Sequence, residues 1–226
     1  MQLNLKNTYK GNIWKLYITN FLSNMQFVAG ILILFFMNWG NLIFSQIMIL
    51  ESWFVGWIFI LEIPTGSIAD YFGRKLSLIL SFITLCMSVL IFSSIPSFAL
   101  FMLGEFIWAL STSLNSGTIE AMTYDTLKKI NKETDSKKIL SRLNSFSALG
   151  LLIASPIGSV IAACISLRAC MLIMSIPVSI AIIIGFTLKE PTEKSTRPKE
   201  KYLVFLRKGI KIFKFSIRWC IIEPDI

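Results

Sequence analysis

The chain has 226 residues, 54% of them hydrophobic and 15% charged, and its mean hydropathy is +0.68. This composition lies outside the range of soluble globular domains and indicates a membrane protein. A net charge of +9 would favour nucleic acid as the partner of a soluble protein. Here the cations lie in the connections between apolar segments, so we expect no nucleic-acid partner.

Uncharged segments recur along the chain at the length that a membrane helix requires. About 20 apolar residues in a helix cross roughly 30 Å of hydrocarbon. The sequence therefore predicts an all-α membrane protein with six transmembrane helices, at about residues 13–37, 42–63, 76–92, 98–119, 143–165 and 169–188. We assign residues 1–12 to a cytoplasmic amino-terminal segment, 13–188 to the six-span transmembrane domain and 189–226 to a basic cytoplasmic linker.

A short polar segment separates the second and third of these spans. It reads Gly66-Ser-Ile-Ala-Asp70-Tyr-Phe-Gly73-Arg74-Lys75. A tight reversal between two helices needs residues that tolerate positive φ, and we expect both glycines to serve this purpose. The order of glycine, aspartate, glycine and two cations resembles the cytoplasmic loop signature of the major facilitator superfamily, a large family of secondary transporters. In that family the loop is a conformational switch.

The resemblance extends over about residues 10–220 and covers one six-helix half of a family that normally has two. It implies a half bundle of the superfamily type that moves a small solute by alternating access, with proton-coupled efflux as the finer expectation. It also implies a lipid bilayer, protons, and either a second six-helix half or a second copy of the chain as partners. The alternative is a truncated, inactive half-transporter or a membrane scaffold without transport activity.

No enzyme, cofactor or metal site is expected from the sequence. The chain contains no histidine, so it lacks a Ser-His or Cys-His pair, and phosphate-binding loops are absent. The four cysteines show neither metal nor redox spacing, and we expect no disulfide.

Polar side chains within the predicted spans are the candidates for a substrate or proton pathway. Asn20 and Asn24 lie four residues apart and share a helix face, where they line a pathway or form packing hydrogen bonds between helices. Glu51 and Glu105 are the intramembrane acids that we expect to matter for coupling, as proton carriers or as counter-ions of a cationic substrate. Each of them is alternatively a hydrated or hydrogen-bonded structural group. Glu62 lies closer to the polar loop.

Charge placement predicts the topology and one ion-pair cluster. With a cytoplasmic amino terminus, all but Arg168 of the 22 Lys and Arg residues lie on the cytoplasmic side or at its edge. Both termini are therefore expected inside, in the cell inner membrane. Arg74 is expected to meet Glu120 or Asp125, which arrive at the same membrane edge.

Two further segments carry expectations about packing. The fifth span has Gly150, Ala154, Gly158 and Ala162 at steps of four, which predicts the close approach of another helix. Residues 189–214 alternate cations with apolar residues and predict an amphipathic helix on the inner leaflet, followed by the start of a seventh span at residues 216–222.

Overall fold

The computed structural model describes residues 2–191, and every regular element in this range is a helix. Within it, five helical stretches are long and apolar enough to cross a membrane: Phe44–Phe72, Arg74–Phe92, Phe98–Lys129, Glu133–Cys164 and Leu167–Thr187. The all-α membrane fold expected from the sequence is thereby confirmed. The amphipathic helix and seventh-span start predicted for residues 192–226 lie outside the described residues.

The first predicted span is discontinuous, so the expectation of one helix over residues 13–37 is wrong. Helix α1 (Gln2–Ser23) ends early, and the chain resumes helical structure in three short pieces, η1 (Ala29–Ile31), α2 (Leu32–Leu34) and the π-helical turn η2 (Phe35–Trp39). Side chains compete for backbone groups at the break, because Ser23 Oγ and Asn24 Nδ2 both donate to the carbonyl of Asn20.

The remaining helices are α3 (Phe44–Phe72), α4 (Arg74–Phe92), α5 (Phe98–Asn115), α6 (Thr118–Lys129), the short η3 (Glu133–Asp135), α7 (Ser136–Cys164) and α8 (Leu167–Thr187). The fourth predicted span is divided after Asn115, because Gly117 adopts a left-handed φ of 67° and redirects the chain into α6. Helices α6 and α7 also extend into the basic stretch between the fourth and fifth predicted spans and leave residues 130–135 between them. Lysine is a good helix former, so this exposed stretch can be helical.

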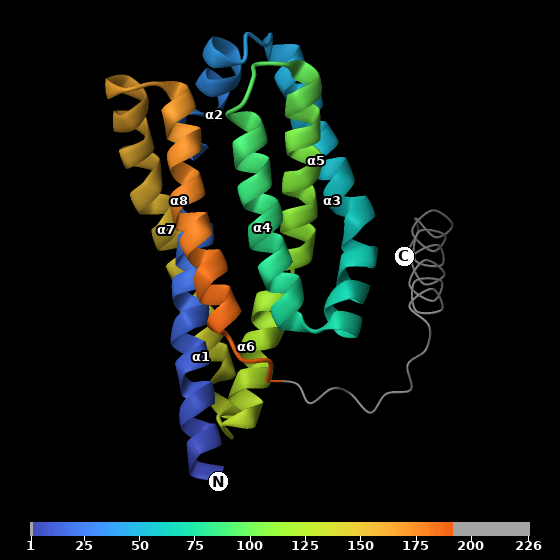
Figure 1. The fold of residues 1–226 in the computed structure, drawn as a ribbon, viewed down its shortest axis with the longest axis vertical. Helices are drawn as coiled ribbons and strands as arrows, with labels where there is room; N and C mark the ends of the chain where they lie inside the picture. The colour runs from blue at the N-terminus through green and yellow to red at the C-terminus, as the bar shows by residue number, and fades with distance from the viewer. Residues whose placement is uncertain (1, 192–226) are drawn as a thin grey trace, which may run out of the picture.

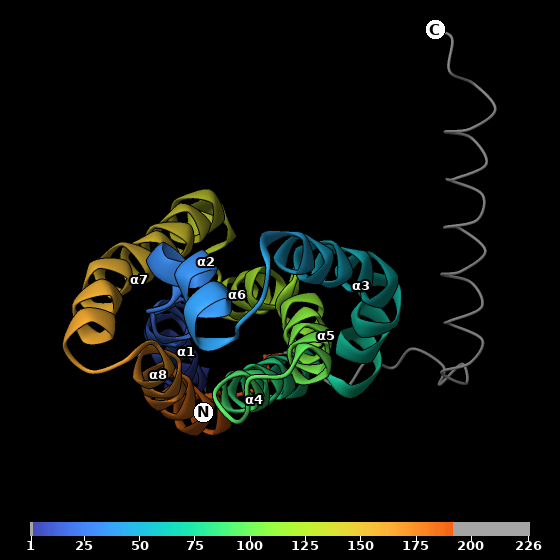
Figure 2. The same cartoon turned by 90° about the horizontal axis from the view of Figure 1, so that it is seen from above.

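The helices form two groups that run side by side along the long axis. Helices α1, α7 and α8 lie on one side, and α3, α4 and α5 lie on the other, with α3 and α7 at opposite edges (Figures 1 and 2). We call one end of the bundle the basic end, and it contains the start of α1, the α3–α4 turn, α6 and the end of α8. The opposite end contains the connections at residues 40–43, 93–97 and 165–166.

Hydrogen bonds from serine side chains join α4 to α5 through the depth of the bundle. The hydroxyls of Ser77 and Ser88 on α4 donate to the carbonyls of Leu114 and Gly104 on α5, at 3.0 and 2.8 Å. Ser111 on α5 donates in return to an α4 carbonyl at 2.7 Å. Small hydroxyl side chains let two helix backbones approach closely in a membrane, so this pair of helices forms a tightly joined unit.

The stripe of small residues on α7 packs closely against the first span at its break. A Cβ added at Gly150 would lie 2.5 Å from the carbonyl oxygen of Phe21, and one added at Gly158 would overlap the backbone of Phe27. The close approach predicted from the sequence is therefore present; its partner is the last turn of α1 at Gly150 and the non-helical backbone before η1 at Gly158. Irregular backbone at membrane depth is tolerated where protein covers it, and α7 supplies that cover.

Candidate functional site

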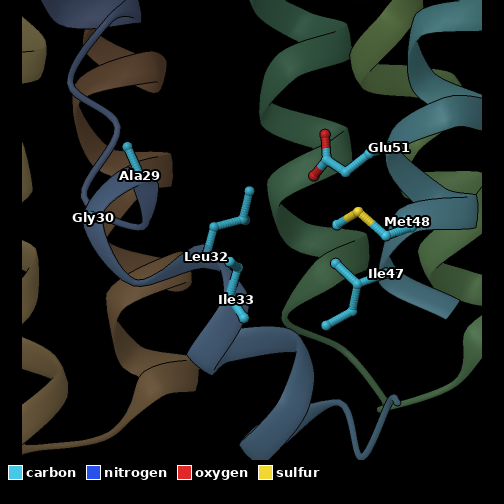
Figure 3. Close-up of a pocket in the computed structure, with 7 residues that line it drawn as sticks. All are labelled: Ala29, Gly30, Leu32, Ile33, Ile47, Met48 and Glu51. Carbon is cyan, nitrogen blue, oxygen red and sulfur yellow. The ribbon is translucent and has the colours of Figure 1, made fainter. Parts of the chain in front are cut away.

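A half-open cavity of about 370 Å³ lies between α3 and the short helical pieces of the first span (Figure 3). Helix α3 contributes one wall and the segment after the helix break contributes the other. The lining residues are Ala29, Gly30, Leu32 and Ile33 from the first span and Ile47, Met48 and Glu51 from α3. Figure 3 shows the Glu51 carboxylate pointing from α3 toward the first-span segment. Glu51 is the charged residue of an otherwise apolar lining.

A second acid, Glu105 on α5, is only 6% exposed, whereas Glu51 is partly exposed at the cavity. Glu105 follows Phe101 by four residues on one helix face, and the ring of Phe101 packs against the first span at Phe36. Across residues 2–191, neither acid forms a hydrogen bond or an ion pair with the protein. Glu51 and Glu105 therefore have no hydrogen-bond or ion-pair partner in the part of the chain that the structure describes.

Asn20 and Asn24 form contacts within the first span and with α7. The buried amide of Asn20 donates from Nδ2 to the carbonyl of Leu143 at 2.8 Å. Asn24 Nδ2 donates to the carbonyl and the side-chain oxygen of Asn20 at 2.8 and 3.2 Å. In this structure both amides therefore serve contacts at the helix break, and neither lines the cavity at Glu51. Their role in a pathway stays a prediction.

The turn between α3 and α4 is tighter than the sequence suggested. Gly66 lies inside α3, which continues to Phe72, so the expectation that it supplies positive φ is wrong. Gly73 alone makes the reversal, with φ of 104°, and α4 begins at Arg74. A side chain is strained at such a φ, which explains glycine at position 73. Asp70 is exposed on the last turns of α3.

The cations after Gly73 reach two different helices at the basic end. Arg74 forms an ion pair with Asp125 of α6 at 2.5 Å and donates a hydrogen bond to the carbonyl of Ala121. The two charged side chains are 26% and 21% exposed, so water screens the pair only in part. Glu120 is exposed and lies outside this ion pair. The switching role of the loop stays a prediction.

Lys75 joins the same turn to the end of α8, a connection that we did not predict. Its backbone N–H donates to Glu190 Oε2 at 2.8 Å, and its Nζ donates to the carbonyl of Phe186 at 2.8 Å. Glu190 also crowds Gly73, since a Cβ there would lie 3.2 Å from Glu190 Oε2. A carboxylate at a helix start satisfies N–H groups that have no partner within the helix. The acid after the sixth span was the available signal in the sequence.

Helix α1 also holds the end of α8. The side chain of Asn12, which is 1% exposed, donates from Nδ2 to the carbonyl of Lys189 at 2.7 Å and accepts from its N–H at 3.1 Å. Lys15 Nζ donates to the carbonyl of Thr187 at 3.0 Å. The last carbonyls of α8 are thus bound by side chains from α1 and α4, which ties three helices together at the basic end.

Between residues 2 and 191, no group of three or more His, Cys, Asp or Glu residues is placed to hold a metal ion. The acids at positions 51 and 105 have no third ligand of this kind beside them.

Helices of membrane length, with a cavity beside a discontinuous helix, define a helical membrane protein with an arrangement typical of secondary transporters. The sequence model of the Major Facilitator Superfamily matches residues 14–222, and the chain belongs to this family. A comparison with curated proteins found no match. As a family member the chain is a multi-pass membrane protein that handles a small solute within a lipid bilayer.

Proposed function

We propose that the chain acts in secondary active transport of a small solute by alternating access, driven by the exchange of protons for solute in the direction of efflux. The supporting observation is the position of Glu51, an ionisable group in an apolar cavity between α3 and a broken helix. Secondary transporters commonly build their binding sites at such discontinuous helices. Acids at membrane depth are costly to bury and mark ion or proton pathways.

Glu51 and Glu105 carry the coupling in this proposal. A carboxylate that binds a proton becomes neutral, and a neutral acid is far less costly in an apolar interior than an ionised one. Proton binding therefore changes which conformations and ligands the cavity favours. The exposed apolar face of α3 completes the pathway by contact with a second six-helix half or a second copy of the chain.

The Arg74–Asp125 ion pair is proposed to act as the switch at the basic end. It joins the start of α4 to α6, so it is broken when those helix ends separate. The Glu190 and Lys75 contacts keep the end of α8 with α4 during that motion. The carrier would then alternate between a state with this pair formed and a state with the pair open.

The basic end is proposed to face the cytoplasm, with both termini there, and the bilayer is proposed to be the cell inner membrane. Among residues 2–191, Arg168 is the cation at the opposite end, where its Nε donates to the carbonyl of Ser93 at 2.7 Å. The other Lys and Arg residues of this range lie at or near the basic end. An excess of cations on one side favours the cytoplasm for that side.

Proton flux in proteoliposomes tests the transport proposal without a known substrate. Vesicles containing the purified chain and trapped pyranine, a membrane-impermeant pH dye, are given a panel of cationic, neutral and anionic solutes. Proton exchange raises the interior pH when a transported solute enters. We expect at least one solute to do so with the parent chain and not with Glu51→Gln/Glu105→Gln or with empty vesicles. If no solute produces protein-dependent proton movement, the transport proposal fails.

A further inference from the structure

The depth of the bundle carries acids without nearby cations. Lys15 and Arg168 are bound to backbone carbonyls at opposite ends, at Thr187 and Ser93. Glu51 and Glu105 lie between those ends without a hydrogen bond or ion pair from residues 2–191. Any charge that neutralises an ionised acid here must therefore come from outside the described part of the chain.

The walls of the cavity restrict what such a neutralising group can be. Apart from Glu51, its lining is made of aliphatic residues, a methionine and a glycine. These side chains offer no further charge and favour contact with an apolar surface. An ionised carboxylate in such surroundings is stabilised by a cation that brings its own apolar body and leaves no polar group unpaired.

The cavity volume distinguishes an organic cation from a bare ion. At about 370 Å³ the cavity falls within the range of small-molecule sites, and it is far larger than a proton or a metal ion requires. A metal ion would also need oxygen or nitrogen ligands that this apolar lining does not provide. One charged lining residue matches one positive charge on the ligand.

We infer that the solute bound beside Glu51 is a monovalent organic cation with an apolar body. Its charge lies against the Glu51 carboxylate, and its body contacts the aliphatic walls from α3 and the first span. This inference rests on the proposed transport function and specifies the chemical class of its substrate.

Two ions of nearly the same shape and opposite charge provide the test. Tetraphenylphosphonium is a monovalent cation surrounded by apolar rings, and tetraphenylborate is its anionic counterpart. Binding of each to the purified full chain in detergent is measured by equilibrium dialysis, with protein-free micelles subtracted. We expect saturable binding of tetraphenylphosphonium and none of tetraphenylborate.

Three variants at two acid positions assign the binding to the cavity. Glu51→Gln should weaken tetraphenylphosphonium binding about tenfold or more, because it removes the charge while keeping the size. Glu51→Asp keeps the charge and should stay within about threefold of the parent. Glu62→Gln is the matched control, since Glu62 is an exposed acid on the same helix outside the cavity lining, and its affinity should equal the parent's.

The inference is overturned if tetraphenylborate binds as tightly as tetraphenylphosphonium, or if Glu51→Gln leaves the affinity unchanged in a folded protein. Circular dichroism and gel filtration show whether each variant is folded. If Glu51→Gln does not fold, Glu51→Asp still tests the inference, because a folded Glu51→Asp variant that does not bind the cation would contradict it. If the cation binds through Glu51 but no solute moves protons in the vesicle assay, the inferred class of ligand is supported and the transport proposal fails. If only neutral or anionic solutes move protons, the transport proposal is supported and the inferred class of substrate is wrong.

Discussion

Glu190 accepts a hydrogen bond from the backbone N–H of Lys75 at 2.8 Å, so a residue beyond the end of α8 caps the start of α4. The two residues are 115 positions apart in the sequence. The other carboxylate oxygen, Oε1, is buried and has no hydrogen-bond partner among residues 2–191. The contact fixes the turn at Gly73 against the last turn of α8.

Replacing Glu190 should lower the stability of the bundle through this contact. Glu190→Ala leaves the Lys75 N–H without its acceptor and removes a negative charge from a helix start, at a cost of about 1 to 2 kcal/mol. Glu190→Gln keeps an acceptor oxygen and should lose less. Thermal unfolding in detergent, followed by circular dichroism, measures both. Glu62→Ala removes an exposed acid and is the control; equal losses in Glu62→Ala and Glu190→Ala would contradict the capping role.

Arg74→Ala should reduce transport while leaving ligand binding in place. The side chain is engaged with Asp125 and the carbonyl of Ala121 at the basic end, and it is not part of the cavity lining. Loss of a partly exposed pair costs about 1 kcal/mol, enough to shift a two-state balance several-fold. Tetraphenylphosphonium dialysis and the vesicle assay separate the two effects. Lys132→Ala, an exposed cation outside the pair, should change neither.

Unchanged transport by Arg74→Ala would exclude a switching role for the ion pair. Loss of binding together with transport would instead indicate that the substitution disrupts the fold. Asp125→Asn offers a check from the partner helix, because it removes the same pair and should reproduce the Arg74→Ala result.

Gly158→Ala should destabilise the protein more than any other single methyl addition among the described glycines of α7. The added Cβ would overlap the backbone of Phe27, which must move away from α7. Overpacking of this kind costs about 1 to 3 kcal/mol. Gly56→Ala is the matched control, because Gly56 lies in α3 with no atom within 4 Å of its Cβ position. It should be neutral or stabilising in unfolding experiments, since alanine favours helices. A smaller loss for Gly158→Ala than for Gly56→Ala would refute the close packing.

Labelling of single cysteines at the two ends of the bundle tests the proposed topology. In a background with the four native cysteines replaced, Ser94→Cys should react with a membrane-impermeant maleimide from the periplasmic face. Lys132→Cys should react only from the cytoplasmic face. Both positions are exposed, so a failure to react would not come from burial. Labelling of Lys132→Cys from the periplasmic face would contradict the proposed orientation.

The sequence predicted the long helices because their uncharged stretches have the length of a bilayer. It did not predict the break after Ser23, since the polar residues there fit equally well in a continuous helix. The break depends on a neighbour, namely α7, where Gly158 admits the irregular backbone at Phe27 and Gly150 admits the chain at Phe21 and Asn24. Gly66 was misplaced for a related reason: a glycine in a polar segment indicates a turn, yet α3 continues through it to Phe72.

The acids of the candidate site could be predicted from the sequence, but the residues that form its walls could not. An acid at membrane depth is unusual on its own, so Glu51 and Glu105 stood out in the sequence. The residues opposite Glu51, such as Gly30 and Leu32, are ordinary in a span and become a wall only through the helix break. Glu190 stood out as an acid after the sixth span, but its contact could not be predicted because its partner, Lys75, is far away in the chain.

Proton release on cation binding tests the central claim that the acids exchange protons for solute. Tetraphenylphosphonium is added to the purified chain in weakly buffered solution, and the pH change is recorded. An ionised carboxylate binds the cation and a protonated one does not, so binding should release protons, up to about one per bound cation, and affinity should increase as pH rises. The Glu51→Gln/Glu105→Gln variant should release none. Binding by the parent chain without proton release, and with an affinity independent of pH, would contradict the claim.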